Sequence, residues 1–242
     1  MEKKLYSNNM CTKNNALRNV YCSESSLYVY NGDLIKLMND RYRDRASVVL
    51  RLDRLDHEDL VLPKYILYNK SGFKGYGMKY YKDYCVLAKM MCDKSIPFNK
   101  RKEIALKICK LFEYMEEEGF GYYDVHSKNI LYKGTDIKLV DMDSGIFDDQ
   151  NRLEYLTYLK HSQQRLAELS LALLYKEILD DLSNELIESK KLILKMVPSN
   201  VKKLYEHVIN RSFTYFRSAE YLDNLTEDTV EETKQVLIKK RG

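Results

Sequence analysis

The fold is decided by the stretch Gly121-Tyr-Tyr-Asp-Val-His-Ser-Lys-Asn-Ile-Leu-Tyr132 and by Ile137-Lys-Leu-Val-Asp-Met-Asp-Ser-Gly145 shortly after it. Apolar and β-branched residues predict two short strands here, over 129–132 and 137–140. The segment Lys133-Gly134-Thr135-Asp136 between them has the composition of a tight turn. The sequence therefore predicts a β-hairpin in the middle of the chain.

Polar side chains flank this predicted hairpin. Asp124 and Asn129 stand in the loop before its first strand, and Asp141 follows its second strand directly. Because the outer ends of a hairpin meet in space, we expect the three side chains to converge on one point. Carboxylate and amide oxygens of this kind suit Mg²⁺, which takes a few such ligands together with phosphate oxygens.

The first part of the chain predicts a small antiparallel sheet. Two apolar runs, 26–30 and 34–38, flank Asn31-Gly32, which is the strongest short signal for a hairpin. Lys36 lies in the second of these strands. The other elements expected before residue 82 are a helix over 40–56 and strands over 65–68 and 75–81.

The rest of the chain predicts helices, apart from the hairpin. Residues 98–118 form an amphipathic pattern that ends at Gly119, a residue suited to a helix C-cap. From residue 163 to 242 the pattern indicates only helices, with a break near Pro198. Residues 1–15 are polar, and we expect them to be disordered.

The motif D-x-H-x-x-N-I-L, followed by I-K-L-V-D, resembles the catalytic loop and the metal-binding loop of kinase-fold phosphotransferases. The D-x-H-x-x-N form is most similar to the aminoglycoside and choline kinase branch and to atypical small bacterial kinases. The resemblance implies a two-lobed, protein-kinase-like α+β fold with a mostly helical C-lobe. Its N-lobe would be a small antiparallel sheet plus one helix. The implied parts are a disordered segment over 1–15, an N-lobe over 16–81 and a C-lobe over 82–242.

The resemblance also implies roles for single residues. Asp124 matches the catalytic aspartate that orients or deprotonates the attacking hydroxyl, and Asn129 matches the metal-binding asparagine. Asp141 matches the aspartate that chelates Mg²⁺ across the phosphates. Lys36 matches the strand lysine that pairs with the α- and β-phosphates of ATP, so both ATP and Mg²⁺ are implied.

Further residues surround this expected site. The resemblance places adenine against the hinge segment that contains Met78, Tyr80 and Tyr81, and Ser25 could contact the nucleotide. His126 is expected to brace the catalytic loop. Asp143 could replace or assist Asp141. The acids on the predicted helix that could pair with Lys36 are Asp44, which we favour, and Asp53.

Departures from the family pattern leave two functions open. The segment Val20–Ser26, where the phosphate-covering loop is expected, has no glycine, and Glu24 within it would repel phosphate. No A-P-E-like sequence follows Gly145. The first hypothesis is an ATP- and Mg²⁺-dependent kinase that acts on a hydroxyl of a protein or small molecule. The second is a pseudokinase, a nucleotide-binding or regulatory module without turnover.

Composition excludes several other classes. Of 242 residues, 45% are hydrophobic and 31% charged, as in a folded domain, and three prolines exclude a fibrous protein. The net charge of +4 is spread along the chain, which disfavours nucleic acid as a partner. Five scattered cysteines form no C-x-x-C pair, so a structural zinc site has no support. A signal peptide and an apolar run of membrane-spanning length are both lacking, which predicts a cytoplasmic protein without a membrane partner.

Overall fold

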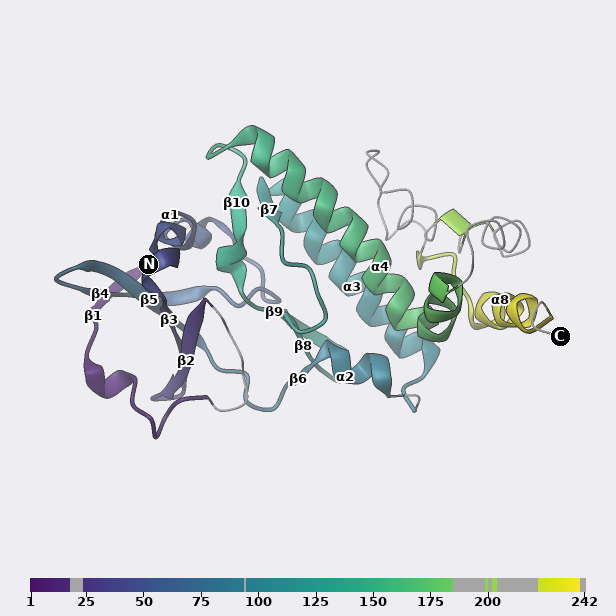
Figure 1. Cartoon of the computed structure of the whole chain (residues 1–242), viewed down its shortest axis with the longest axis horizontal. Coiled ribbons are helices and arrows are strands. Elements are labelled where there is room, and N and C mark those ends of the chain that lie inside the picture. Colours follow the sequence, from purple (N-terminus) through teal and green to yellow (C-terminus); the bar gives the residue numbers. More distant parts are fainter. Residues whose placement is uncertain (18–23, 94, 185–198, 200–201, 204–221, 240–242) are drawn as a thin grey trace.

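A computed structural model describes residues 1–17, 24–93, 95–184, 199, 202–203 and 222–239 of the chain (Figure 1). Its largest sheet has five strands in the order β1-β4-β5-β3-β2. All neighbours in this sheet are antiparallel except β1 and β4, which run parallel. The strands are β1 (Glu2–Leu5), β2 (Ser25–Tyr30), β3 (Asp33–Met38), β4 (Pro63–Asn69) and β5 (Gly72–Lys79).

The hairpin predicted around Asn31-Gly32 is confirmed as β2 and β3. Asn31 and Gly32 have φ angles of 50° and 82°, the left-handed backbone that a tight hairpin turn of this type requires. The register pairs Leu27 with Lys36, and β5 pairs Tyr76 with Lys36 from the other side. Lys36 therefore lies on an inner strand of the sheet.

The disorder predicted for residues 1–15 does not describe the start of the chain. Residues Glu2–Leu5 form β1, which pairs with Tyr65–Tyr68 of β4. A second short element, η1 (Asn8–Met10), follows it. Polar residues at a sheet edge need little burial, so composition alone does not distinguish such a strand from a disordered segment.

The helix predicted over residues 40–56 is replaced by short turns. These are η2 (Asp40–Arg45), α1 (Ala46–Val49) and η3 (Leu52–Arg54), of which only α1 is α-helical. Tyr42 leaves helical geometry at φ −113° and ψ 15°, which interrupts the first turn. Val49 and Leu52 are still fully buried, whereas Leu50 is exposed.

The second half of the chain contains two further sheets. One has the order β6-β8-β9, and the other pairs β7 with β10. The expected two-lobed fold with a mostly helical second lobe is therefore wrong, and the chain is a mixed α/β structure. The hairpin predicted over 129–140 is confirmed as β8 and β9, whereas the missed strands β6, β7 and β10 have only two or three residues, which is too short for alternation to be visible in sequence. The strands are β6 (Cys85–Val86), β7 (Phe120–Tyr122), β8 (Ile130–Lys133), β9 (Asp136–Leu139) and β10 (Gly145–Phe147).

Two long helices run side by side across these sheets (Figure 1). The helix predicted over 98–118 is confirmed as α3 (Phe98–Glu117), and Gly119 follows it with the left-handed φ of 70° expected of a C-cap glycine. The other described helices are α2 (Leu87–Cys92), α4 (Arg152–Asn184) and α8 (Glu227–Lys239), with the short turn η4 at Met142–Ser144. The break predicted near Pro198 lies outside the described residues. Among the helices described here, none is long and apolar enough to span a membrane.

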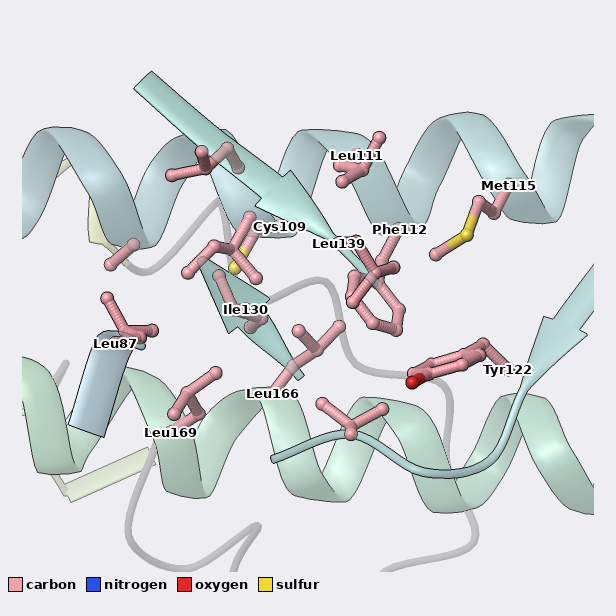
Figure 2. Close-up of a cluster of buried hydrophobic side chains, with 14 of the residues drawn as sticks. Leu87, Cys109, Leu111, Phe112, Met115, Tyr122, Ile130, Leu139, Leu166 and Leu169 are labelled. Atoms are coloured by element: carbon pink, nitrogen blue, oxygen red, sulfur yellow. The ribbon is translucent and has the colours of Figure 1, made fainter. Parts of the chain in front are cut away.

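The main apolar core lies between α3 and α4. Figure 2 shows Leu111, Phe112 and Met115 of α3 facing Leu166 and Leu169 of α4. The side chains of β8 and β9 fill the space between the helices, and all of these residues belong to one buried cluster. Burial of apolar area at this core fixes the hairpin β8–β9 and therefore the residues at its outer end.

The segment 59–61, which leads into β4, is hydrogen-bonded to β9. The amide of Val61 donates to the Leu139 carbonyl at 2.9 Å, and the Leu139 amide donates to the Asp59 carbonyl at 2.8 Å. The Lys138 ammonium also contacts the Asp59 carboxylate at 2.9 Å. These contacts hold the chain that leads into β4 against the strand that leads to Asp141.

Candidate active site

Lys36 and two aspartates form the centre of the site. The Lys36 Nζ donates to Oδ1 of Asp141 and, at 2.6 Å, to Oδ1 of Asp143. The lysine comes from β3 in the five-stranded sheet, and the aspartates follow β9 more than 100 residues later. Lys36 is only 2% exposed, so a buried ion pair links the five-stranded sheet to the segment that follows β9.

Asp143 is contacted by donors from β3, β5 and η2. Besides Lys36, the Tyr76 hydroxyl donates to Oδ1 at 2.7 Å, and the Arg45 guanidinium lies 3.5 Å from Oδ2. The aspartate itself is 1% exposed. A buried carboxylate needs such partners, because an unpaired charge in a protein interior is costly.

The two aspartates differ in their ionisation. Burial acts to raise the pKa of Asp143, but Lys36, Tyr76 and Arg45 together hold it below the usual value. Burial raises the pKa of Asp141, because its only strong compensation comes from Lys36 and the nearby Asp143 charge opposes it. For Lys36, burial lowers the pKa, but the two carboxylates outweigh it and raise the pKa. The lysine is therefore charged, and Asp143, which is buried and accepts from three donors, is a carboxylate that the fold holds as an anion.

Asp141 has an unusual backbone. Its φ and ψ are 67° and 37°, in the left-handed region that side chains other than glycine rarely adopt. Such a conformation costs on the order of 1–2 kcal/mol, and residues held in it cluster at functional sites. The turn η4 follows at once, and this reversal brings the Asp143 side chain back toward the sheet.

Asp124 and Asn129 form a second hydrogen-bonded group in the loop before β8. The Asn129 Nδ2 donates to Oδ2 of Asp124 at 2.9 Å and to the Asp124 carbonyl at 3.1 Å. His126 places Nε2 3.4 Å from the same carboxylate oxygen. Its Nδ1 accepts the amides of Lys128 and Asn129, both at 3.2 Å, so the neutral ring carries its proton on Nε2.

This loop makes Asp124 an anion. The hydrogen bond from His126 is the largest cause that lowers the pKa of Asp124, and burial only partly opposes it. The Asp124 carboxylate raises the pKa of His126 in return. The two amides that donate to Nδ1 oppose protonation at that atom, so they favour the neutral ring. An ionised, half-exposed carboxylate can accept a hydrogen bond from an approaching hydroxyl.

Tyr122 and Val140 connect the Asp124 loop to Asp141. The Val140 amide donates to the Asn129 carbonyl at 2.9 Å, which continues the β8–β9 pairing to the residue before Asp141. The buried Tyr122 hydroxyl donates to the Val140 carbonyl at 3.2 Å and accepts from Asn129 Nδ2 at 3.0 Å. Asn129 and Asp141 therefore lie on neighbouring positions at one end of the hairpin.

Asp44, expected to pair with Lys36, does not do so. The acids that reach the lysine are Asp141 and Asp143, whereas the Asp44 carbonyl accepts a hydrogen bond from Ser47 within its own turn. The alternative, Asp53, lies 3.5 Å from the terminal amine of Met1. Both choices assumed a regular helix over 40–56, and the short turns found there orient the side chains differently.

Arg45 and Glu24 belong to the site, although sequence reasoning did not select Arg45. The Arg45 guanidinium binds Glu24 through two contacts, of 2.5 and 2.9 Å, and lies 3.4 Å from the Ser144 hydroxyl. Arg45 ends η2, and Glu24 precedes β2. Arg45 is one of three arginines in residues 40–45, and no sequence signal separates it from a surface charge.

The residues expected to contact the nucleotide, namely Met78, Tyr80 and Tyr81 at the adenine and Ser25 elsewhere, lie in or near the sheet. Met78 is buried in β5, and Ser25 is buried at the start of β2 opposite Met38. Tyr80 follows β5, and the Tyr81 ring packs edge-on to Tyr84 at 5.0 Å. Their contact with a nucleotide stays a prediction.

The donor set suits Mg²⁺. Asn129 uses its amide nitrogen for every hydrogen bond of its side chain among the described residues, which leaves Oδ1 available. Within the described ranges, no group of three or more His, Cys, Asp or Glu side chains forms a metal cage. Mg²⁺ does not require one, because it usually takes one or two carboxylates and fills its remaining positions with water and phosphate oxygens. Asp141 and Asn129 fit that pattern.

Neither a scan against protein-family models nor a search of curated proteins finds a match to this chain. The resemblance of the D-x-H-x-x-N motif to phosphotransferases therefore stays a prediction.

Proposed function

We propose that the chain is an ATP- and Mg²⁺-dependent phosphotransferase that moves the γ-phosphoryl group of ATP to a hydroxyl of a protein or small molecule. The observation that supports this most is the contact of Lys36 with Asp141 and Asp143 across more than 100 residues of sequence. This contact brings a lysine that could bind phosphate together with a carboxylate that could bind a metal ion, next to the loop of Asp124. Phosphoryl transfer needs this combination of positioning and charge neutralisation.

Each residue has a distinct part in the proposed reaction. Asp141 and Asn129 would hold Mg²⁺, which when bound neutralises charge on the phosphate oxygens. Asp124 is ionised and half-exposed, so it can accept the proton of the attacking hydroxyl or orient it. His126 and Asn129 hold that carboxylate in place through their hydrogen bonds.

A second candidate is a nucleotide-binding or regulatory module without turnover. The observation that favours it is the burial of Lys36, whose charge is already balanced by two carboxylates. Productive binding of a triphosphate would require Asp141 to exchange its lysine contact for a metal ion. A chain in which this exchange is incomplete would bind nucleotide and transfer nothing.

The test is ATP consumption in the presence of Mg²⁺, read as ADP release. We expect Asp124→Asn to reduce the rate by at least about 100-fold, the size that general-base contributions reach. Asp141→Asn should reduce it at least as much, because Mg²⁺ would lose a carboxylate ligand. Asp83→Asn is the matched control, because Asp83 is a surface carboxylate whose side chain is 73% exposed. A rate that is unchanged in both site variants, with melting temperatures equal to the wild type, would refute the proposal.

Calorimetry with a non-hydrolysable ATP analogue and Mg²⁺ separates the two candidates. Binding of the analogue, together with ADP release from ATP in the rate assay, supports the enzyme. Binding of the analogue without ADP release from ATP supports the regulatory module. The Asp141→Asn variant should weaken binding only when Mg²⁺ is present, because its proposed role is to hold the metal ion. Equal weakening with and without Mg²⁺ would remove Asp141 from that role.

A further inference from the structure

The site contains a second cation, Arg45, whose surroundings differ from those of Lys36. Lys36 is 2% exposed and bound to two carboxylates, whereas the Arg45 side chain is 22% exposed. Solvent therefore reaches Arg45 in the structure as it stands. Part of the Arg45 side chain is therefore accessible while the Lys36 ion pairs are intact.

Arg45 also lies near the charges of the Asp124 loop and of the segment that follows β9. It contacts Asp143 and the Ser144 hydroxyl beside it, at 3.5 and 3.4 Å. The pKa of Asp124 is lowered first by the hydrogen bond from His126, and the Arg45 guanidinium acts in the same direction from further away. Arg45 is therefore within electrostatic reach of both the Asp124 loop and the segment after β9.

The present partner of Arg45 is an anion of the right shape. Glu24 binds the guanidinium with both carboxylate oxygens, Oε1 at 2.9 Å and Oε2 at 2.5 Å. The planar fork of arginine fits a carboxylate and a phosphate in the same two-point manner. Glu24 is itself partly exposed, so an incoming phosphate can replace it without leaving a buried charge unpaired.

The same contact accounts for an acid where phosphate is expected. Glu24 stands just before β2, in a segment without glycine, and an unpaired glutamate there would repel a nucleotide. Paired with Arg45, it is neutralised, and its release would expose one positive charge to the ligand. The pair therefore behaves as an anion site that is already filled from within the chain.

We propose that Arg45 is a phosphate-binding residue of this site and that Glu24 is an internal anion that occupies it until a phosphate group takes its place. The ligand class is the phosphate chain of a nucleoside triphosphate or of an inorganic polyphosphate. The inference deepens the proposed phosphotransferase function and rests on it for the nucleotide, but not for inorganic polyphosphate.

The experiment measures binding of two probes by calorimetry, inorganic tripolyphosphate and a non-hydrolysable ATP analogue with Mg²⁺. We expect Arg45→Ala to weaken both by about 10- to 100-fold, the range for a lost hydrogen bond to a charged group. Arg45→Lys should recover part of the loss, because it keeps the charge but not the fork. Glu24→Gln should strengthen binding several-fold. The matched control is Arg43→Ala, which removes an arginine from the same turn that is paired with Asp40.

The outcomes separate this inference from the proposed function. If Arg45→Ala and Arg43→Ala have equal effects while Asp124→Asn abolishes ADP release, the role of Arg45 is refuted and the phosphotransferase stands. If tripolyphosphate binding depends on Arg45 and Glu24 as expected but no ADP is released, the inference stands and transfer is refuted. If the folded wild type binds neither probe, both are refuted. Should Arg45→Ala fail to fold, Glu24→Gln decides, because unchanged affinity in that variant contradicts the proposed displacement.

Discussion

Neutralising Asp143 should destabilise the chain far more than neutralising Asp141, although both contact Lys36. Asp143 is 1% exposed and has Lys36, Tyr76 and Arg45 as donors, and its pKa is lowered, so the fold favours its ionised form. Removing one partner from a buried ion pair costs about 3–5 kcal/mol. Because Lys36 keeps Asp141 as a partner, we expect the lower end, about 3 kcal/mol, for Asp143→Asn.

The corresponding cost for Asp141→Asn is small. Its side chain is 23% exposed, and among the described residues its donor is Lys36, whereas Asp143 is buried and has three donors. Loss of that charge should cost no more than about 1 kcal/mol, as for partly exposed ion pairs. The two isosteric variants therefore differ by about 2 kcal/mol, with Asp143→Asn the weaker.

Urea denaturation at pH 7, followed by circular dichroism, measures this difference. Asp143→Asn should also melt roughly 6–12 °C below the wild type, given the usual slope of about 2–4 °C per kcal/mol for chains of this size. Equal stability of the two variants, or a larger loss in Asp141→Asn, would show that Asp143 contributes no more than Asp141 to the stability of the ion pairs with Lys36.

Three further outcomes follow from other contacts. Tyr122→Phe should cost about 1–3 kcal/mol in urea denaturation, because it leaves the Val140 carbonyl without the buried hydroxyl that donates to it; a loss below 0.5 kcal/mol, well under the range of about 1–3 kcal/mol, would contradict this. Gly145→Ala should cost about 1–3 kcal/mol, since its Cβ would lie 2.0 Å from the Phe120 ring; an unchanged melting temperature would refute the close packing. The pKa of Asp143 is lowered, so its stabilisation is present above about pH 3.9 and is lost as pH falls through the lower folded value. As pH falls, the wild type should therefore lose more unfolding free energy than Asp143→Asn. Parallel curves of unfolding free energy against pH for the two proteins would contradict this stabilising role of Asp143.

Strong local signals made parts of the fold predictable. The Asn31-Gly32 hairpin and helix α3 with Gly119 were recognisable because each depends on residues close together in sequence. The short strands β7 and β10 were not, because three residues show no periodicity and their pairing joins distant parts of the chain. Strand β1 was missed for the same reason, since its partner β4 lies some 60 residues away.

The site was predictable where it follows from the hairpin β8–β9. The positions of Asp124, Asn129 and Asp141 are set by the strands that adjoin them. The partner of Lys36 was not predictable, because the left-handed backbone at Asp141 and the turn after it decide where Asp143 points. Sequence carries no direct signal for such a reversal at a residue other than glycine.

The enclosure of Lys36 has a consequence for chemical labelling. Amine-directed acylating reagents attack only a neutral, accessible amine, and this one is protonated and shielded from solvent. In a digest analysed by mass spectrometry, Lys36 should rank among the slowest lysines to acquire a label. A rise in its reactivity on addition of a ligand would then report directly that the ion pair with Asp141 and Asp143 has opened.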